Sequence, residues 1–495
     1  MEQHQVLVMA VDVDAAVVVP LVKVAVVVVN AVATKHPQCK ITFNSIRLTL
    51  VNLIPFKIIT DMKISDYNIY VPVSSQVICF NTLQETFALL PISLYEQLVE
   101  GKINDIKESN LSLLKENGCI VDDDTSELDL LKKEYDWAVS ENNSVYSLTL
   151  LPSLDCNLRC WYCFERHIKG SHMTSLVQEN IVKYISEILG RETIQHLDVE
   201  LFGGEPLLYF EEELYPLLLK IKEMAINMGK TTSFFFVTNA TCIKHHHIPL
   251  FKELEAKFQI SIDGYKNKHN EVKYDFNTKE PTYEKVLNII HDLCNSYEQC
   301  YINLRINYDN ETLQYIPEVI KDIADIDRRK LGIHLERVWQ TKRNESSGDT
   351  LKEIIKLILG NGFIVSFTNF FRKSYSCKTS KYNQSIISYD GKVYKCSGRN
   401  FTNDLQEGIL LPNGKIEWEK QKLEKRLNLN TYTNNQCLSC KLLPLCWGPC
   451  AQKQLEYPGN IKRFCQLELM EISLEDYVFF TFNNQILRNK IYANE

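Results

Sequence analysis

The sequence predicts an α/β fold built on a parallel sheet that curves into a barrel or partial barrel. Six apolar segments typical of strands recur between about residues 144 and 339, and helical segments separate most of them. They read SVYSLTLLP, HLDVELFGG, SFFFVTNA, FQISIDG, YINLRINYD and GIHLERVW. Polar motifs directly follow four of them, beginning at Cys156, Gly203, Asn239 and Asp263. Because active sites in such folds lie at the carboxyl ends of the strands, we expect one site there.

The length, charge and cysteine content of the chain limit the classes of protein to which it can belong. The chain has 495 residues, of which 45% are hydrophobic and 24% charged, and its net charge is −7. A chain of this length is too long for one ordinary hydrophobic core, so we expect two to four domains. The negative net charge gives no reason to expect nucleic acid as a partner. Sixteen cysteines, clustered in two places, do not resemble a secreted disulfide scaffold. We therefore expect metal sites in a reducing compartment and a cytoplasmic location.

The amino-terminal segment, residues 1–61, is rich in Val and Ala and low in complexity. Asp12, Asp14, Pro20 and Lys23 interrupt it, so there is no clean run of about 18 apolar residues for a spanning helix. Glu2 stands where a signal peptide would have a basic residue. We expect a poorly ordered extension, and a membrane anchor is the less favoured alternative.

The rest of the chain divides into four predicted parts. Residues 62–142 read as strands followed by helices, which is typical of a small α+β unit. Residues 143–345 hold the repeating strands and helices, and residues 370–470 form a turn-rich region containing seven cysteines. A helical tail over residues 471–495 ends the chain.

Three thiols lie close together in DCNLRCWYCFE, at Cys156, Cys160 and Cys163. A disulfide plus one free thiol is one interpretation. A structural zinc site would need a fourth ligand, and His167 lies just downstream, so zinc stays open. A four-iron cluster normally takes one Cys per iron, so three thiolates would leave one iron free to bind a small molecule.

The spacing C-x3-C-x2-C, with aromatic Tyr162 before the last Cys, resembles the signature of the radical S-adenosylmethionine (SAM) superfamily. The turn LFGGEP, with Gly203, Gly204 and Glu205, follows the second strand and strengthens the resemblance. A tight turn leaving a strand would also explain it. In the family this turn faces the amino group of SAM, which implies close backbone approach at the glycines and a carboxylate partner for an ammonium group.

Three further strand ends carry weaker resemblance. Ser261 and Asp263 in SIDG match a stretch that lies near the SAM ribose and carboxylate in related enzymes. Asn239 lies in TNA, where the family has TNG, and Arg305 in NLRIN would place a cation near the SAM carboxylate. Each could equally be a polar group in a loop.

The resemblance also implies a mechanism. The open iron binds SAM, an electron from a low-potential donor such as flavodoxin or ferredoxin breaks a sulfur–carbon bond, and a 5′-deoxyadenosyl radical takes hydrogen from the substrate. The protein positions the substrate, while the cofactor supplies the reactivity. We assign no catalytic residue from the sequence.

A second group of cysteines resembles the SPASM extension of radical SAM enzymes that modify peptides. The run CLSCKLLPLCWGPC is C-x2-C-x5-C-x3-C, whereas a zinc ribbon would have two C-x2-C pairs. The resemblance implies one auxiliary 4Fe-4S cluster on Cys437, Cys440, Cys446 and Cys465. It implies another on Cys377, Cys396 and Cys450, for which there is no obvious fourth Cys. We expect most of the scattered cysteines to be buried, namely Cys39, Cys79, Cys119, Cys242, Cys294 and Cys300.

Two subfamilies compete for the substrate. Anaerobic sulfatase maturases typically have Asp after the Cys of a G-x4-C element, and this chain has Ser397 there. The other subfamily crosslinks ribosomally made precursor peptides and often captures a leader peptide by strand addition on a small N-terminal unit. Residues 62–142 have a suitable size, so we expect a precursor peptide as the partner. Sulfatase maturation and a non-catalytic iron–sulfur electron-transfer protein are the alternatives.

Overall fold

The computed structural model describes residues 61–342, 346–367, 377–429, 431–459 and 462–493. The expected extension over residues 1–61 lies outside the described residues, apart from Asp61. The chain forms two compact units, divided between Glu127 and Leu128. Among the described helices, none is long and apolar enough to cross a membrane.

The smaller unit is an α+β arrangement. Strands β2 (Asn68–Val73), β3 (Gln76–Asn81) and β4 (Thr86–Pro91) form an antiparallel sheet with β3 in the centre, while β1 (Met62–Ile64) pairs with β5 (Ile120–Asp122). Helices α1 (Ile92–Val99) and α2 (Glu108–Glu116) contribute Leu94, Leu98 and Leu114 to its core. At its end the Glu127 carboxylate accepts hydrogen bonds from Ser65 Oγ at 2.6 Å and Asp66 N at 2.8 Å.

The larger unit contains the predicted parallel sheet. Its strands are β6 (Val145–Leu151), β7 (His196–Leu201), β8 (Thr231–Thr238), β9 (Lys257–Asp263), β10 (Ile302–Tyr308) and β11 (Leu331–Arg337). They pair in sequence order and in parallel, and the short β12 (Val365–Ser366) continues the sheet beyond β11. The six strands that the sequence predicted are all present, and the α/β prediction is confirmed.

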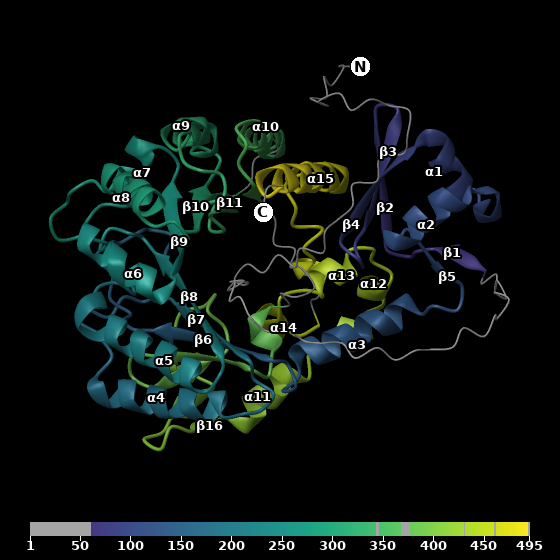
Figure 1. Ribbon diagram of the computed structural model, residues 1–495. Coiled ribbons are helices and arrows are strands. Elements are labelled where there is room, and N and C mark those ends of the chain that lie inside the picture. The colour runs from purple at the N-terminus through teal and green to yellow at the C-terminus, as the bar shows by residue number, and fades with distance from the viewer. Residues whose placement is uncertain (1–60, 343–345, 368–376, 430, 460–461, 494–495) are drawn as a thin grey trace, which may run out of the picture. The chain divides into compact units, whose positions relative to one another are not determined.

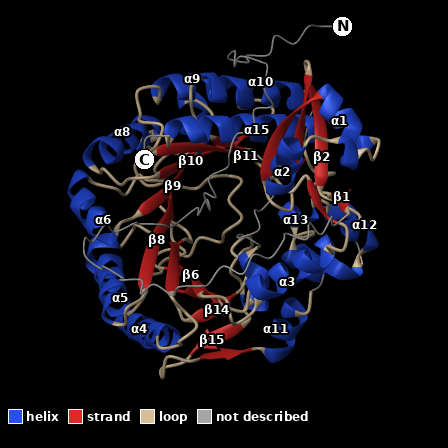
Figure 2. Cartoon of the chain, turned by 45° about the vertical axis from the view of Figure 1, so that its right-hand side comes forward, coloured by secondary structure: helices blue, strands red, loops and turns tan. Residues whose placement is uncertain are grey.

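Helices cover the outer face of this sheet, as Figures 1 and 2 show. They are α4 (Ser175–Leu189), α5 (Tyr215–Asn227), α6 (Ile248–Leu254), α7 (Lys266–Val272), α8 (Tyr283–Ser296), α9 (Ile316–Asp322) and α10 (Ser347–Gly360). In β7, Leu197, Val199 and Leu201 are buried, and they alternate with the partly exposed Asp198 and Glu200. Because side chains alternate along a strand, the face opposite the helices carries polar groups.

The cysteine-rich region continues the same sheet from its other edge. Strand β13 (Gln384–Ser388) pairs in parallel with β6, and β14 (Lys392–Tyr394), β15 (Gly408–Leu410) and β16 (Ile416–Trp418) follow antiparallel. Its helices are α11 (Lys420–Leu427), α12 (Asn435–Leu438), α13 (Leu443–Cys446) and α14 (Ala451–Glu456). Helix α15 (Leu474–Ile491) follows it and packs on α10.

Helix α3 (Glu127–Val139) begins where the smaller unit ends, and all but its first residue belong to the larger unit. Leu131 is fully buried, and its carbonyl accepts a hydrogen bond from the Tyr432 hydroxyl at 3.3 Å. Tyr135 packs against Trp447, with ring centroids 5.1 Å apart. The helix is therefore anchored on the cysteine-rich region.

Candidate functional site

The cysteine loop, residues 155–163, follows the carboxyl end of β6. Hydrogen bonds to its first residue, Asp155, stabilise its conformation. The Asp155 carboxylate accepts hydrogen bonds from Cys156 N and Gly170 N, both at 2.8 Å, and lies 3.3 Å from Arg159 NH2. The Arg159 guanidinium also lies over the Phe276 ring, 4.8 Å from its centroid. These contacts fix the conformation of the loop and therefore the relative positions of its three cysteines.

The three thiols of the loop lie near one another in a partly buried environment. Burial raises the pKa of Cys156 and of Cys160, and it raises the pKa of Cys163 to about 11. Cys163 N donates to Cys160 O at 3.0 Å, and negative charge on a neighbouring thiol adds to the upward pKa shift of Cys156 and Cys163. Neutral thiols must lose protons to bind metal, so metal binding at this loop releases protons.

The predicted glycine turn packs directly on the strand end that leads into the cysteine loop. Gly204 N donates to Ser153 O at 3.1 Å, and Glu205 N donates to Asp155 O at 2.8 Å. A Cβ atom on Gly204 would lie 2.0 Å from Asp155 O, and Gly203 has a φ of 108°. Both positions therefore require glycine, because the two backbones meet there.

Glu205 is fully buried and joins this turn to the end of β8. Its carboxylate accepts from Thr238 Oγ1 at 2.7 Å, from Asn239 N at 2.9 Å and from Leu207 N at 3.1 Å. Burial raises its pKa, and the three hydrogen bonds oppose that shift. In this structure Glu205 orients the next strand end, a role that the sequence did not indicate.

Asn239 brings the end of β8 to the first cysteine. Its side-chain amide donates to Asn157 Oδ1 at 3.1 Å and lies 3.7 Å from Cys156 Sγ. The next residue, Ala240, has a φ of 63°. This left-handed conformation gives a physical reason for the glycine that the family has at that position.

Asp263 and Asn307 bring the ends of β9 and β10 to the same loop. The Tyr162 hydroxyl donates to Asp263 Oδ2 at 2.6 Å, and Asn307 Nδ2 donates to Asp263 Oδ1 at 2.8 Å and to the Tyr162 hydroxyl at 3.1 Å. Tyr162, predicted only as the aromatic residue of a motif, is thus the link between the cysteine loop and two strands.

Lys273, which the sequence analysis did not single out, is buried beside these groups. Its ammonium donates to Ser261 Oγ at 2.7 Å and lies 4.0 Å from Asp263 Oδ1. Burial lowers its pKa, but Asp263 and the thiols of the cysteine loop raise it, and the net shift is upward. Only the fold places this lysine at the site, since it lies nine residues beyond the end of the SIDG motif.

Arg305 lies on β10 between Ser261 of β9 and His334 of β11. Its Nε donates to Asn307 Oδ1 at 3.0 Å, and its NH2 lies 3.9 Å from Glu336 Oε1. Glu336 in turn lies 3.0 Å from His334 Nε2. A continuous row of polar side chains therefore runs from the cysteine loop across the inner face of the sheet to β11.

The cysteines of the carboxyl-terminal region gather into two sets. Cys437, Cys440, Cys446 and Cys465 line one cavity of about 260 Å³, and burial raises the pKa of Cys446 to about 12. Burial raises the pKa of Cys396 to about 11, and charge on Cys377 and Cys450 adds to the shift. The four cysteines of the first set thus line one cavity, and the assignment of both sets to clusters stays a prediction.

Among the described residues, Glu211, His246 and His247 bring three His, Cys, Asp or Glu ligand atoms within 4.8 Å of one another.

Four of the scattered cysteines, Cys79, Cys119, Cys294 and Cys300, are buried as expected, and Cys242 is partly buried. Cys39 lies outside the described residues.

Comparison with known proteins identifies the fold that carries this site. Residues 150–323 match the profile of the radical SAM superfamily. This segment is a radical SAM domain. Enzymes of this superfamily use a 4Fe-4S cluster and SAM, and these are the cofactors of this chain.

Two relatives extend beyond the radical SAM domain. The chain is 25% identical over 368 residues to a cysteine-type anaerobic sulfatase-maturating enzyme of Clostridium novyi (strain NT), covering 63% of this chain and 90% of the relative. It is 22% identical over 403 residues to the radical SAM cyclopropyl synthase TigE of Paramaledivibacter caminithermalis, covering 74% and 80%.

A solved structure with a similar fold is that of native anSMEcpe with bound AdoMet, with a TM-score of 0.51 and 18% identity, covering 71% of this chain and all of that one. The matched profile and the two relatives make this chain a radical SAM enzyme related to maturases.

Proposed function

We propose that this radical SAM enzyme modifies a ribosomally made precursor peptide by removing a hydrogen atom and forming a crosslink or a similar modification. One observation carries the proposal: hydrogen bonds connect the cysteine loop to the ends of β7, β8, β9 and β10. Side chains from successive strand ends thus form a single connected site around three thiols.

In this proposal Cys156, Cys160 and Cys163 hold the cluster, and their three thiolates leave one iron for SAM. The backbone of Gly203 and Gly204 and the side chains of Glu205, Asn239, Ser261, Asp263 and Arg305 line the SAM site. When bound, the cluster and SAM supply a 5′-deoxyadenosyl radical and methionine. The role of the chain is to fix the loop through Tyr162 and Asn157 and to hold SAM and substrate in register.

The two further cysteine sets are proposed to hold auxiliary clusters. The set around Cys437 has four thiols, which suits one Cys per iron. The set of Cys377, Cys396 and Cys450 has three, so that cluster would have a non-cysteine ligand or an open iron. A low-potential donor such as flavodoxin or ferredoxin would supply electrons.

The peptide substrate is supported by the relatives and by the smaller unit. The fold of anSMEcpe is also known with bound AdoMet and the Cp18Cys peptide, so this fold accommodates both together. In the smaller unit of this chain, β2 and β4 are the edge strands of a three-stranded sheet. An extended leader peptide could add to one of these edges through backbone hydrogen bonds, as other peptide-binding domains do.

The first experiment tests SAM cleavage. The anaerobically reconstituted and reduced enzyme should release 5′-deoxyadenosine from SAM, and the variant in which Cys156, Cys160 and Cys163 are replaced by Ala should not. Equal release from both proteins would overturn the assignment of the site and favour an electron-transfer protein without catalytic activity.

The second experiment tests the leader-binding role. A deletion of residues 62–126 leaves α3 in place, because α3 packs on the cysteine-rich region. It should abolish modification of a precursor peptide encoded by a neighbouring gene, while cleavage of SAM without peptide continues. An unchanged rate of peptide modification would show that the unit has only a structural role.

A third experiment addresses the sulfatase-maturing relative. Incubation with a peptide that carries a sulfatase Cys or Ser motif should give no formylglycine, because Ser397 stands where maturases typically have Asp. Formation of formylglycine, detected by mass spectrometry, would make sulfatase maturation the function.

A further inference from the structure

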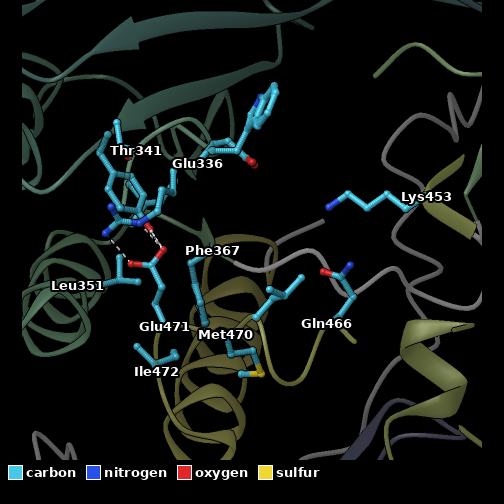
Figure 3. Close-up of a pocket in the computed structure, with 14 residues that line it drawn as sticks. Glu336, Thr341, Leu351, Phe367, Lys453, Gln466, Met470, Glu471 and Ile472 are labelled. Carbon is cyan, nitrogen blue, oxygen red and sulfur yellow. Dashed lines mark hydrogen bonds and ion pairs between the residues drawn. The ribbon is translucent and has the colours of Figure 1, made fainter. Parts of the chain in front are cut away.

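A cavity of about 410 Å³ lies at the carboxyl ends of β10 and β11, and none of the predicted site residues lines it. One wall comes from Tyr308, Leu335 and Trp339 at these strand ends. The lining also includes Leu469 and Met470, from the segment between Cys465 and α15, as well as Phe367. Figure 3 shows Phe367, Met470 and Glu471 near one another, with Lys453 and Gln466 extending toward the cavity from the cysteine-rich region.

The cavity adjoins the candidate SAM site. Gln340, next to Trp339, donates a side-chain hydrogen bond to Tyr162 O in the cysteine loop. Glu336, which lines the cavity, is the last member of the polar row that runs from Asp263 through Asn307 and Arg305. A group bound in the cavity would therefore lie beside the loop where the radical is proposed to form.

The cavity also adjoins the set of cysteines around Cys437. Gln466 lines both this cavity and the one formed by Cys437, Cys440, Cys446 and Cys465. A substrate from which a hydrogen atom and then an electron are removed needs to lie between the two centres. The position of the cavity meets this requirement.

The charges around the cavity indicate what it binds. Arg337 and Glu471 form an ion pair with two contacts of 2.7 Å, and both side chains are 8% exposed. Glu336 is paired with His334, and the Lys453 ammonium lies 5.3 Å from the centroid of the Phe464 ring. Since these charged groups already have partners, a charged ligand would gain little, and the other lining residues are apolar or aromatic except for Thr341 and Gln466.

Trp339 strengthens this argument. Its side chain is 71% exposed, although burial of a large aromatic side chain is strongly favourable. We propose that the cavity binds a large uncharged side chain, aliphatic or aromatic, of the peptide to be modified, with Trp339 as its main contact. This proposal rests on the proposed function and adds the class of side chain that the enzyme selects.

The test uses a small probe, so it does not depend on knowing the peptide. N-acetyl-photoleucinamide, an uncharged leucine analogue with a photoreactive diazirine, is irradiated with the anaerobic holoenzyme. Mass spectrometry of the digest should place the crosslinks on residues 335–341 and 466–472. N-acetyl-leucinamide should compete with the label, and N-acetyl-glutamate amide at the same concentration should not.

Variants locate the site. Trp339→Ala should reduce labelling at least fivefold, and Trp339→Phe should restore most of it, because an aromatic ring is sufficient. Trp137→Ala is the matched control, since Trp137 is also exposed, at 56%, but lies on α3, and labelling should be unchanged. Circular dichroism checks that each variant is folded.

Three outcomes would overturn the proposal: crosslinks spread over the surface, equal competition by the glutamate amide, or labelling that Trp339→Ala leaves unchanged. The release of 5′-deoxyadenosine is measured on the same holoenzyme. Absence of that product would contradict the proposed function, whereas normal release with no labelling of the cavity would contradict only the side-chain site.

Discussion

At the scale of single residues, the glycine turn after β7 meets the backbone of the segment that leads into the cysteine loop. The glycines after β7 were expected to allow close approach to SAM. In the structure, Ser153 and Asp155 bring their backbone to these glycines. A glycine pair indicates that another group approaches the backbone closely, but a single sequence does not show which distant segment supplies that group. Lys273 was missed for a related reason, because nothing in its neighbourhood predicts that its side chain is buried.

Gly204→Ala should therefore disrupt the site. The added methyl group would lie 2.0 Å from Asp155 O, so the turn or the cysteine loop must move, at a cost of about 1–3 kcal/mol. We expect a lower thermal midpoint and incomplete iron incorporation at the first cluster. The control is Gly360→Ala at the end of α10, where a Cβ atom meets nothing within 4 Å. Equal iron content and stability in both variants would contradict this account.

Tyr162→Phe tests the link between the cysteine loop and β9. The variant keeps the aromatic ring and removes the hydroxyl that donates to the Asp263 carboxylate. Loss of a hydrogen bond to a charged group costs about 1.5–3 kcal/mol, so iron should leave the reconstituted protein about tenfold faster or more. Iron release to a chelator measures this rate. If Asp263→Asn alone gives the same effect and the double variant adds nothing, the two side chains act as one unit.

At the scale of elements, the strands of the barrel were predictable and those of the cysteine-rich region were not. The six barrel strands are six to eight residues long and carry buried apolar residues at regular positions, which is a strong local signal. Strands β14, β15 and β16 have three residues each, too few for a periodic pattern. The pairing of β13 with β6 joins segments more than 200 residues apart, which local sequence does not encode.

Helix α3 gives a test at this scale, because two adjacent leucines differ in burial. Leu131 is fully buried and Leu130 is 46% exposed. Leu131→Ala should destabilise the larger unit by about 2–5 kcal/mol, and Leu130→Ala should change its stability by less than about 0.5 kcal/mol. Thermal unfolding followed by circular dichroism measures the difference. Similar effects of the two substitutions would show that α3 is not anchored on the cysteine-rich region.

At the scale of the whole molecule, function depends on contacts between segments that are remote in sequence. The carboxyl-terminal cysteines gather into sets of four and three across intervals of up to 73 residues, counted from Cys377 to Cys450. The family resemblance predicted this grouping, whereas spacing alone did not. Nothing in the sequence predicted the contact that fixes one of these sets relative to the barrel, the ion pair between Arg337 and Glu471.

This ion pair joins the end of β11 to the segment six residues beyond Cys465. The Glu471 carboxylate also accepts a hydrogen bond from the Tyr308 hydroxyl at 3.2 Å, so β10 takes part as well. Arg337→Met would leave the Glu471 carboxylate buried without its cation, at a cost of about 3–5 kcal/mol. We expect a lower thermal midpoint and loss of iron from the cluster proposed to include Cys465.

The double variant Arg337→Met with Glu471→Met separates charge from position. Replacing both partners removes the uncompensated charge, so stability should recover much of what the single variant loses. Iron content should recover together with stability. If the pair also sets the position of the Cys465 segment, however, labelling of the neighbouring cavity by N-acetyl-photoleucinamide should stay reduced. The reason is that two methionines cannot reproduce the geometry of the ion pair. Full recovery of labelling would show that apolar packing alone positions this wall. A double variant less stable than Arg337→Met would contradict the electrostatic account.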